Sequence, residues 1–164
     1  MSTHSIRTRF LGTGTSFRVS GAGWSDWILL LRLAAGWWML HAGLDKIWAW
    51  PFDASWFGGG AAQGTILAPF VAVPLGQTAI GFGLILGVLT RTAAFFGAFM
   101  MLFFYFINGE TGGWAHGVIT GDLLGLLIFA MIATLGAGRV LGVDAYLAKT
   151  SFVRDHPRLR YFIG

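Results

Sequence analysis

Three ionisable side chains lie close together in the sequence, in a pattern suited to proton transfer and anion binding. His41 and Asp45 are four residues apart, and Lys46 follows directly. Because positions i and i+4 share a helix face, His41 and Asp45 can interact, and we assign them to acid and base chemistry. Lys46 supplies a cation for an anionic substrate. Three later polar residues are assigned with it to substrate binding: Glu110, His116 and Asp122.

Metal-based chemistry has little support in the sequence. The chain has no cysteine, which excludes thiolate metal sites, iron–sulfur clusters and dithiol relays. A haem between His41 and His116 would need two facing helical histidines, and we expect His116 to precede its helix. We therefore expect no metal or haem, so electron chemistry must use another bound cofactor or a partner.

Composition indicates the environment in which these residues work. The chain has 164 residues, enough for one domain; 55% are hydrophobic and only 11% are charged. A typical soluble domain has about 25% charged residues, and the mean hydropathy here is +0.69. The composition predicts a membrane protein.

Apolar runs divide the chain into four spans. A spanning helix needs about 20 apolar residues, and residues 27–47 provide the first. Residues 66–107 are about twice as long as one spanning helix, so we expect them to form a hairpin that turns at Thr90 and Arg91. We expect the regular part of its first helix to begin near Pro74. Residues 119–135, ended by Gly136 and Gly138, form the fourth. The expected fold class is all-α, a polytopic four-helix transmembrane bundle.

The basic residues set the orientation. Three lie in the N-terminal tail, one in the turn at Arg91 and five in the C-terminal tail, while the loops 49–65 and 108–118 have none. Positive charge stays inside, so both termini are predicted cytoplasmic in a multi-pass protein of the cell membrane. Arg32 and Lys46, near opposite ends of the first span, are expected to snorkel to the two interfaces.

We divide the chain into a flexible basic tail at 1–23, a membrane domain at 24–137 and an interfacial basic and aromatic tail at 138–164. The net charge of +4 is assigned to lipid headgroups rather than nucleic acid, because the basic residues flank apolar spans. The expected partners therefore begin with the lipid bilayer.

Small residues indicate how the spans pack. Helices in lipid associate where glycine or alanine allows close approach, as at Gly83 and Gly87, Ala93 and Gly97, and Gly117, Gly121 and Gly125. Helical periodicity places Arg32, Gly36, Gly43 and Lys46 on one stripe that faces the other helices. The stripe predicts the buried side of the first span.

The polar residues at the outer ends of the spans allow two interpretations. They form one outward-opening ligand site, or they are interfacial groups wetted by headgroup water, with Lys46 paired to Asp122 or Glu110. Gln77 and Asn108 can hydrogen-bond a quinone carbonyl or another helix.

Three strings resemble a known family. Leu31-Arg32-Leu33 followed by His41-Ala42-Gly43-Leu44-Asp45-Lys46 resembles the opening motif of the DoxX/DoxD family. The residues GFGLILGVLTR at 81–91 resemble its second signature, and GRVLGVDAYL at 138–147 is similar to the ending of DoxD-like members. The resemblance covers about residues 30–147.

The resemblance implies a four-helix membrane subunit of a quinone-linked redox complex, such as thiosulfate:quinone oxidoreductase. Quinone then enters as a substrate, flanked by Trp37, Trp38 and Gln77, while His41 or Asp45 handles the quinol protons. The chain carries only the DoxD-like part, so a DoxA-like redox partner or a homo-oligomer is expected. The alternatives are a non-catalytic anchor or assembly subunit, and a solute pore or carrier.

Overall fold

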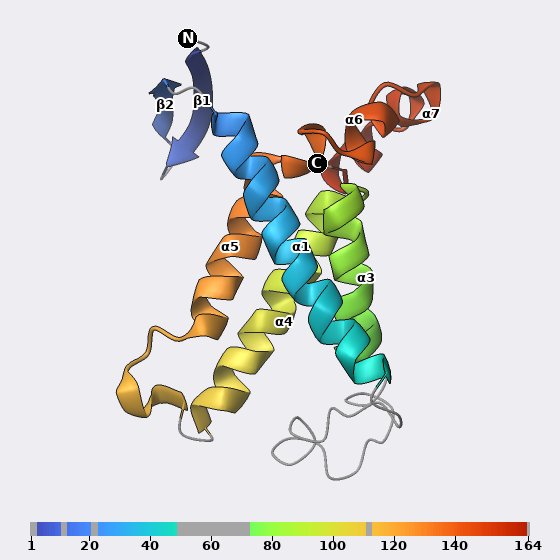
Figure 1. The fold of residues 1–164 in the computed structure, drawn as a ribbon. Coiled ribbons are helices and arrows are strands. Elements are labelled where there is room, and N and C mark those ends of the chain that lie inside the picture. The colour runs from blue at the N-terminus through green and yellow to red at the C-terminus, as the bar shows by residue number, and fades with distance from the viewer. Residues whose placement is uncertain (1–2, 11–12, 21–22, 49–72, 111–112, 164) are drawn as a thin grey trace.

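Four antiparallel helices form the body of the molecule (Figure 1). The computed structural model describes residues 3–10, 13–20, 23–48, 73–110 and 113–163. The helices are α1 (Trp24–Trp48), α3 (Val73–Leu86), α4 (Thr90–Glu110) and α5 (Gly121–Leu135). The start of α1 and the end of α5 lie at the same end of the bundle, which also holds both chain termini (Figure 1).

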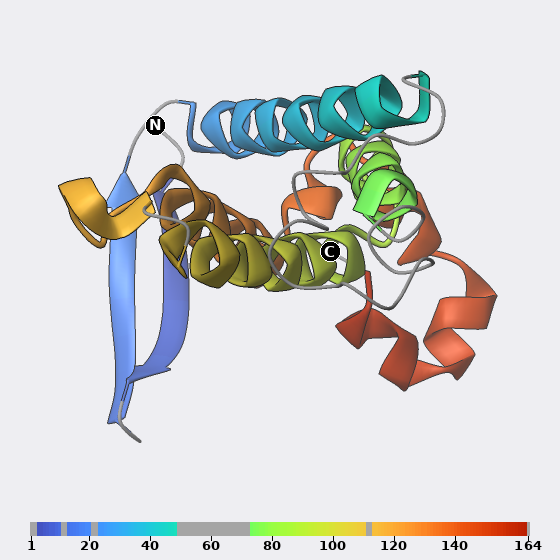
Figure 2. The same cartoon turned by 90° about the horizontal axis from the view of Figure 1, so that it is seen from below.

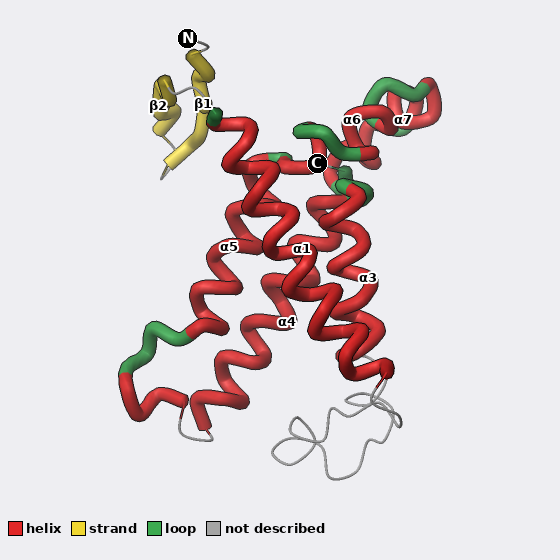
Figure 3. The backbone as a smooth tube through the Cα atoms, viewed as in Figure 1, coloured by secondary structure: helices red, strands yellow, loops and turns green. Residues whose placement is uncertain are grey.

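Short elements occupy the two ends of the bundle. The 3₁₀ turn η2 (Gly113–His116) joins α4 to α5 at one end. The other end carries the C-terminal segment, which we define as residues 137–163 and which continues the backbone tube beyond α5 (Figure 3). This segment contains η3 (Ala137–Arg139), α6 (Val143–Leu147), α7 (Ser151–Asp155) and η4 (Pro157–Tyr161).

The helices begin and end close to the positions predicted from the apolar runs. α3 ends at Leu86 and α4 begins at Thr90, so the predicted hairpin is present, but its turn is at residues 87–89 and Thr90 and Arg91 already belong to α4. Gly136 ends α5 in the left-handed conformation, with φ of 63°, which glycine adopts without steric cost. The regular part of α3 begins at Val73, directly before Pro74, and the preceding residues 49–72 lie outside the described residues.

Two of the described helices, Trp24–Trp48 and Thr90–Gly109, are long and apolar enough to cross a membrane. α3 and α5 are also apolar but have 14 and 15 residues, or about 21 to 23 Å of helix against a hydrocarbon thickness of about 30 Å. The all-helical membrane fold agrees with the predicted fold class. The count of four crossings remains a prediction.

The N-terminal residues differ from the expected flexible tail. Strands β1 (Thr3–Phe10) and β2 (Thr13–Ser20) pair antiparallel, from Thr3 opposite Ser20 to Phe10 opposite Thr13. Both strands contain threonine and phenylalanine, and β1 adds an isoleucine and β2 a valine; these residues favour extended backbone. The all-α description therefore applies to the bundle and not to this hairpin.

The bundle consists of two helix pairs, α1 with α3 and α4 with α5. Gly81 of α3 lies against α1, and a Cβ there would be 2.5 Å from the Leu40 backbone nitrogen. Gly97 of α4 lies against the Phe129 ring in the same way, at 2.8 Å. The small residues thus mark real contacts, whereas Gly117 and Gly121, also predicted to pack, have nothing within 4 Å. The two pairs diverge toward the end opposite the termini (Figures 1 and 2).

Arg32 is the largest fully buried side chain, with 1% exposure. Its guanidinium donates hydrogen bonds to the backbone oxygens of Ala137 and Val140, both at 2.8 Å, and of Leu141 at 3.2 Å. The expectation that Arg32 snorkels to the interface is therefore wrong. The side chain instead donates to backbone oxygens at and just after η3, and it shares the Ala137 oxygen with the Val140 amide, which lies 3.2 Å from it.

Asp144 completes the contact between the C-terminal segment and the bundle. Its carboxylate accepts hydrogen bonds from the amides of Leu89 and Thr90, at 2.8 and 2.9 Å, at the start of α4. Its own amide donates to the Gly87 oxygen at 2.8 Å. Leu89 has a φ of 48°, a conformation that costs energy outside glycine, and these bonds hold it in place.

Candidate functional site

A groove on the C-terminal half of α1 collects most of the predicted site residues. It has a volume of about 500 Å³ and is lined by Trp37, Trp38, His41, Ala42, Asp45 and Lys46. All six come from a single helix, because positions separated by three or four residues share a face. The sequence therefore positions this group by local geometry alone.

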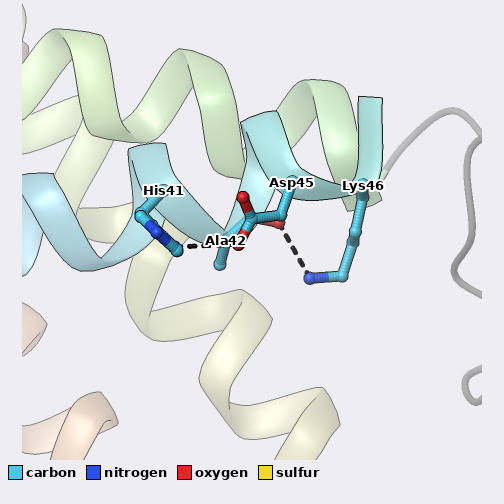
Figure 4. Close-up of polar contacts among 4 residues, drawn as sticks. All are labelled: His41, Ala42, Asp45 and Lys46. Carbon is cyan, nitrogen blue, oxygen red and sulfur yellow. Dashed lines mark hydrogen bonds and ion pairs between the residues drawn. The ribbon is translucent and has the colours of Figure 1, made fainter. Parts of the chain in front are cut away.

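His41 and Asp45 are in direct contact. His41 Nδ1 lies 2.9 Å from Asp45 Oδ2, and the two side chains are 60% and 63% exposed. Figure 4 shows both projecting from the same side of α1. A carboxylate on Nδ1 orients the imidazole, which leaves Nε2 to exchange a proton with a ligand.

Lys46 bonds to its own helix. Its Nζ donates to the Ala42 backbone oxygen at 2.9 Å (Figure 4). One of the two interpretations paired Lys46 with Asp122 or Glu110. The structure shows no ion pair between Lys46 and Asp122: Lys46 donates to Ala42, and the Asp122 carboxylate accepts a hydrogen bond from Asn108 Nδ2 at 2.8 Å. Lys46 therefore stays beside His41 and Asp45 as the cation of the groove.

The two tryptophans form the aromatic part of the groove. The Trp37 and His41 ring centroids are 6.0 Å apart, and Trp38 is stacked on Phe129 of α5 with centroids 6.4 Å apart and an angle of 11° between planes. Trp37 is 61% exposed and Trp38 46%. The indole surfaces beside the polar residues suit a planar, mostly apolar ligand.

Gln77, the third residue assigned to a quinone, is placed elsewhere. It is 4% exposed within α3 and is not among the residues that line the groove. Its Oε1 atom is buried without a hydrogen-bond partner. The structure therefore does not bring Gln77 to the two tryptophans.

The predicted single polar cluster is divided between the two helix pairs. His41, Asp45 and Lys46 lie on α1, whereas Asp122 lies at the start of α5 beside Asn108 of α4. The divergence of the pairs separates these helix ends (Figures 1 and 2). Glu110 is the last residue of α4 and His116 the last of η2, as expected for a histidine that precedes its helix. For these two residues the structure describes the backbone alone.

Sequence reasoning missed the pairing of Asn108 with Asp122 and the burial of Asp144. The first joins residues on either side of the α4–α5 connection, and a polar residue at each end of a short connection was the available signal. The only sequence feature that pointed to Asp144 was the family string at 138–147. Within the described part of the chain, no group of three or more histidine, aspartate or glutamate side chains is arranged to hold a metal ion.

Comparison with known proteins decides the family. The family model described as DoxX matches residues 27–109, just over half of the chain. The chain belongs to the DoxX family. This match covers α1, α3 and α4 and therefore includes the whole groove. Neither the curated proteins nor the solved structures include a match to this chain.

Proposed function

We propose that this DoxX-family membrane protein is a subunit of a quinone-linked redox complex, and that the groove on α1 receives the quinone head. The observation that carries the proposal is the His41–Asp45 pair, at 2.9 Å, beside two exposed indole rings. Thiosulfate is the proposed electron donor, by resemblance of the chain to DoxD-like proteins. Four crossings of the cell membrane, with both termini cytoplasmic, belong to the same proposal.

The groove residues supply proton transfer and binding. A quinone that is reduced to quinol takes up two electrons and two protons. His41, oriented by Asp45, is placed to donate a proton to a quinone oxygen and to be reprotonated from water. Lys46 attracts an oxyanion or a developing quinone oxyanion. The electrons come from the donor through a partner subunit.

The test measures thiosulfate-dependent reduction of a short-chain quinone by the purified full chain in lipid nanodiscs, with and without the copurifying partner. We expect His41→Ala to lower turnover by about 10²-fold, the ordinary contribution of a general acid. Trp37→Ala is expected to raise the KM for quinone while leaving kcat nearly unchanged, because it removes binding surface.

Matched controls lie at the other end of the same helix. A third groove variant, Asp45→Asn, removes the carboxylate that orients His41 and should also lower turnover. Asp26 and Trp27 are exposed residues in the first turn of α1, so Asp26→Asn and Trp27→Ala repeat the chemical changes of Asp45→Asn and Trp37→Ala outside the groove. Both controls are expected to retain full activity. Equal activity of the groove variants and the controls would remove the groove from the reaction.

A second candidate is a non-catalytic anchor or assembly subunit. The exposure of His41 and Asp45 on the outside of α1, and the separation of Asp122 from them, favour it. In that case the groove would contact a partner protein. The partner should then carry all cofactors and keep full turnover when His41→Ala replaces the parent chain. The same partner should no longer copurify with this variant.

A further inference from the structure

A second and larger groove lies between α3 and α4, outside the site on α1. Its volume is about 930 Å³, within the range of ligand pockets. Fifteen residues line it, and Thr92 is the only polar one. Four phenylalanines on its walls, each about half exposed, are Phe82, Phe96, Phe99 and Phe103.

The groove extends along almost the whole length of α3. Val73 lines one end, and Val88, Leu89 and Thr92 line the end near the chain termini. Fourteen residues of helix correspond to about 21 Å. The absence of hydrogen-bonding side chains over most of this length disfavours a polar ligand and suits a flexible hydrocarbon chain.

The C-terminal segment borders the upper end of the groove. The Phe162 oxygen accepts hydrogen bonds from Thr92 N at 3.4 Å and from Thr92 Oγ1 at 3.2 Å. Ile163 is buried, with 3% exposure, and so fixes the end of the chain against the protein. The first residues of the segment contact Arg32 of α1, whereas α6 and α7 lie on the α3 side of the bundle, away from α1 (Figures 1 and 2).

This segment has the composition of a membrane-interface element. Residues 138–164 contain five basic residues and two acids, and one acid, Asp144, is fully buried. Arg154 and Arg158 are exposed, and η4, which contains Arg158, ends at Tyr161 next to the Thr92 contact. Aromatic side chains on the same segment are strongly exposed: Tyr146, Phe152, Tyr161 and Phe162. Aromatic and basic residues together favour the anionic headgroup region.

We propose that the α3–α4 groove holds an acyl chain of an anionic phospholipid, whose phosphate binds the arginines of the C-terminal segment. Charge complementarity selects this occupant, because the segment that carries the exposed Arg154 and Arg158 contacts Thr92 at one end of an otherwise apolar groove. A neutral hydrocarbon would gain nothing from them. The proposal is independent of the redox function, since the two grooves share no lining residue.

The experiment adds phosphatidylglycerol or phosphatidylcholine, with identical acyl chains, to the full chain in detergent. Native mass spectrometry counts retained lipids, and thermal unfolding measures stabilisation. We expect phosphatidylglycerol to be retained preferentially. The double variant Arg154→Gln/Arg158→Gln should lower this preference by about fivefold for each arginine removed. Arg9→Gln/Arg18→Gln, which removes two charges from the N-terminal hairpin, should leave it unchanged.

A second pair of variants tests the groove itself. Ala79 lines the groove from α3, so Ala79→Phe fills it and should lower retention of phosphatidylglycerol about tenfold. Ala34 is exposed on α1 outside both grooves, and Ala34→Phe should have no effect. Equal retention by these two variants, or no preference for phosphatidylglycerol in the parent chain, overturns the proposal. A dimer of the parent chain that Ala79→Phe dissociates also overturns it, by assigning the groove to a second copy.

Discussion

At the residue scale, Arg32 and Asp144 join parts of the chain that are far apart in sequence. Arg32 lies in the first helix and donates to backbone oxygens about 105 residues later. Asp144 binds the amides that begin α4, and the two charges attract one another. A buried charge is tolerated only with such partners. These residues therefore fix the C-terminal segment on the bundle.

Replacing Arg32 tests this role. Arg32→Met keeps much of the side-chain volume but removes the guanidinium donor from the Val140 oxygen and leaves the Ala137 oxygen only the Val140 amide, so we expect a loss of about 3 kcal/mol in unfolding free energy. The unfolding free energy of Arg32→Lys should lie between those of the parent chain and Arg32→Met, because one ammonium cannot reproduce the guanidinium geometry. Denaturant unfolding in a fixed detergent measures both. Lys149→Gln, a change at an exposed position of the C-terminal segment, should stay within about 0.5 kcal/mol. Unfolding of Arg32→Met at the parent's midpoint would contradict the assignment.

Local spacing predicted part of this picture. The 100° helical step placed Arg32, Gly36, Gly43 and Lys46 on the inward stripe of the first span; the first three are buried, whereas Lys46 is only half-buried and lines the groove. The same rule predicted the contact of His41 with Asp45. The partners of Arg32 were not predictable in this way, because they are backbone oxygens of a distant segment and backbone oxygens leave no sequence pattern.

At the element scale, close packing of α1 on α3 depends on glycine. Gly81→Ala would place a methyl group 2.5 Å from the Leu40 backbone nitrogen, and a backbone atom cannot move aside as a flexible side chain does. We expect a loss of about 1 to 3 kcal/mol in unfolding free energy, measured under the same conditions as for Arg32. The added methyl group would also push α1 and α3 apart.

Gly121 provides the matched control for this prediction. It begins α5, and a methyl group added there would have no atom within 4 Å. Gly121→Ala should therefore be neutral or more stable by about 0.5 kcal/mol, because it lowers the entropy of the unfolded chain. Equal changes in the unfolding free energy of Gly81→Ala and Gly121→Ala would show that packing against Leu40 does not control the effect.

Element boundaries followed from the sequence because turns and helix ends carry their own residue signals. Gly136 ends α5, and Thr120 caps its start by accepting a hydrogen bond from the Leu123 amide. The divergence of the two helix pairs had no such signal. It depends on which small residues meet across the interface, and Gly121, predicted to pack, lies in open space.

At the scale of the whole molecule, the arrangement of the helices makes a testable prediction of membrane topology. Ser25 and Thr150 lie at the end of the bundle with the termini, and Val118 lies at the opposite end beside η2. All three positions are exposed. The chain has no native cysteine, so Ser25→Cys, Thr150→Cys and Val118→Cys can each be labelled individually.

An impermeant maleimide applied to intact cells should label Val118→Cys and leave the other two unreacted. Lysed cells, in which all three variants should react, control for accessibility of each thiol. The expectation rests on the positive residues of both tails remaining inside. Labelling of Ser25→Cys and Thr150→Cys from opposite sides would rule out an even number of crossings.

The sequence by itself determined the membrane class, the helix boundaries and the groove residues on α1, because hydropathy, turn residues and helical periodicity act over a few residues. Only the tertiary structure decided that Asp122 is separated from Lys46, that Gln77 is buried away from the tryptophans, and that Arg32 binds the C-terminal segment. These outcomes depend on how helices distant in sequence pack. Such packing results from many weak contacts between surfaces, and no single stretch of sequence specifies it.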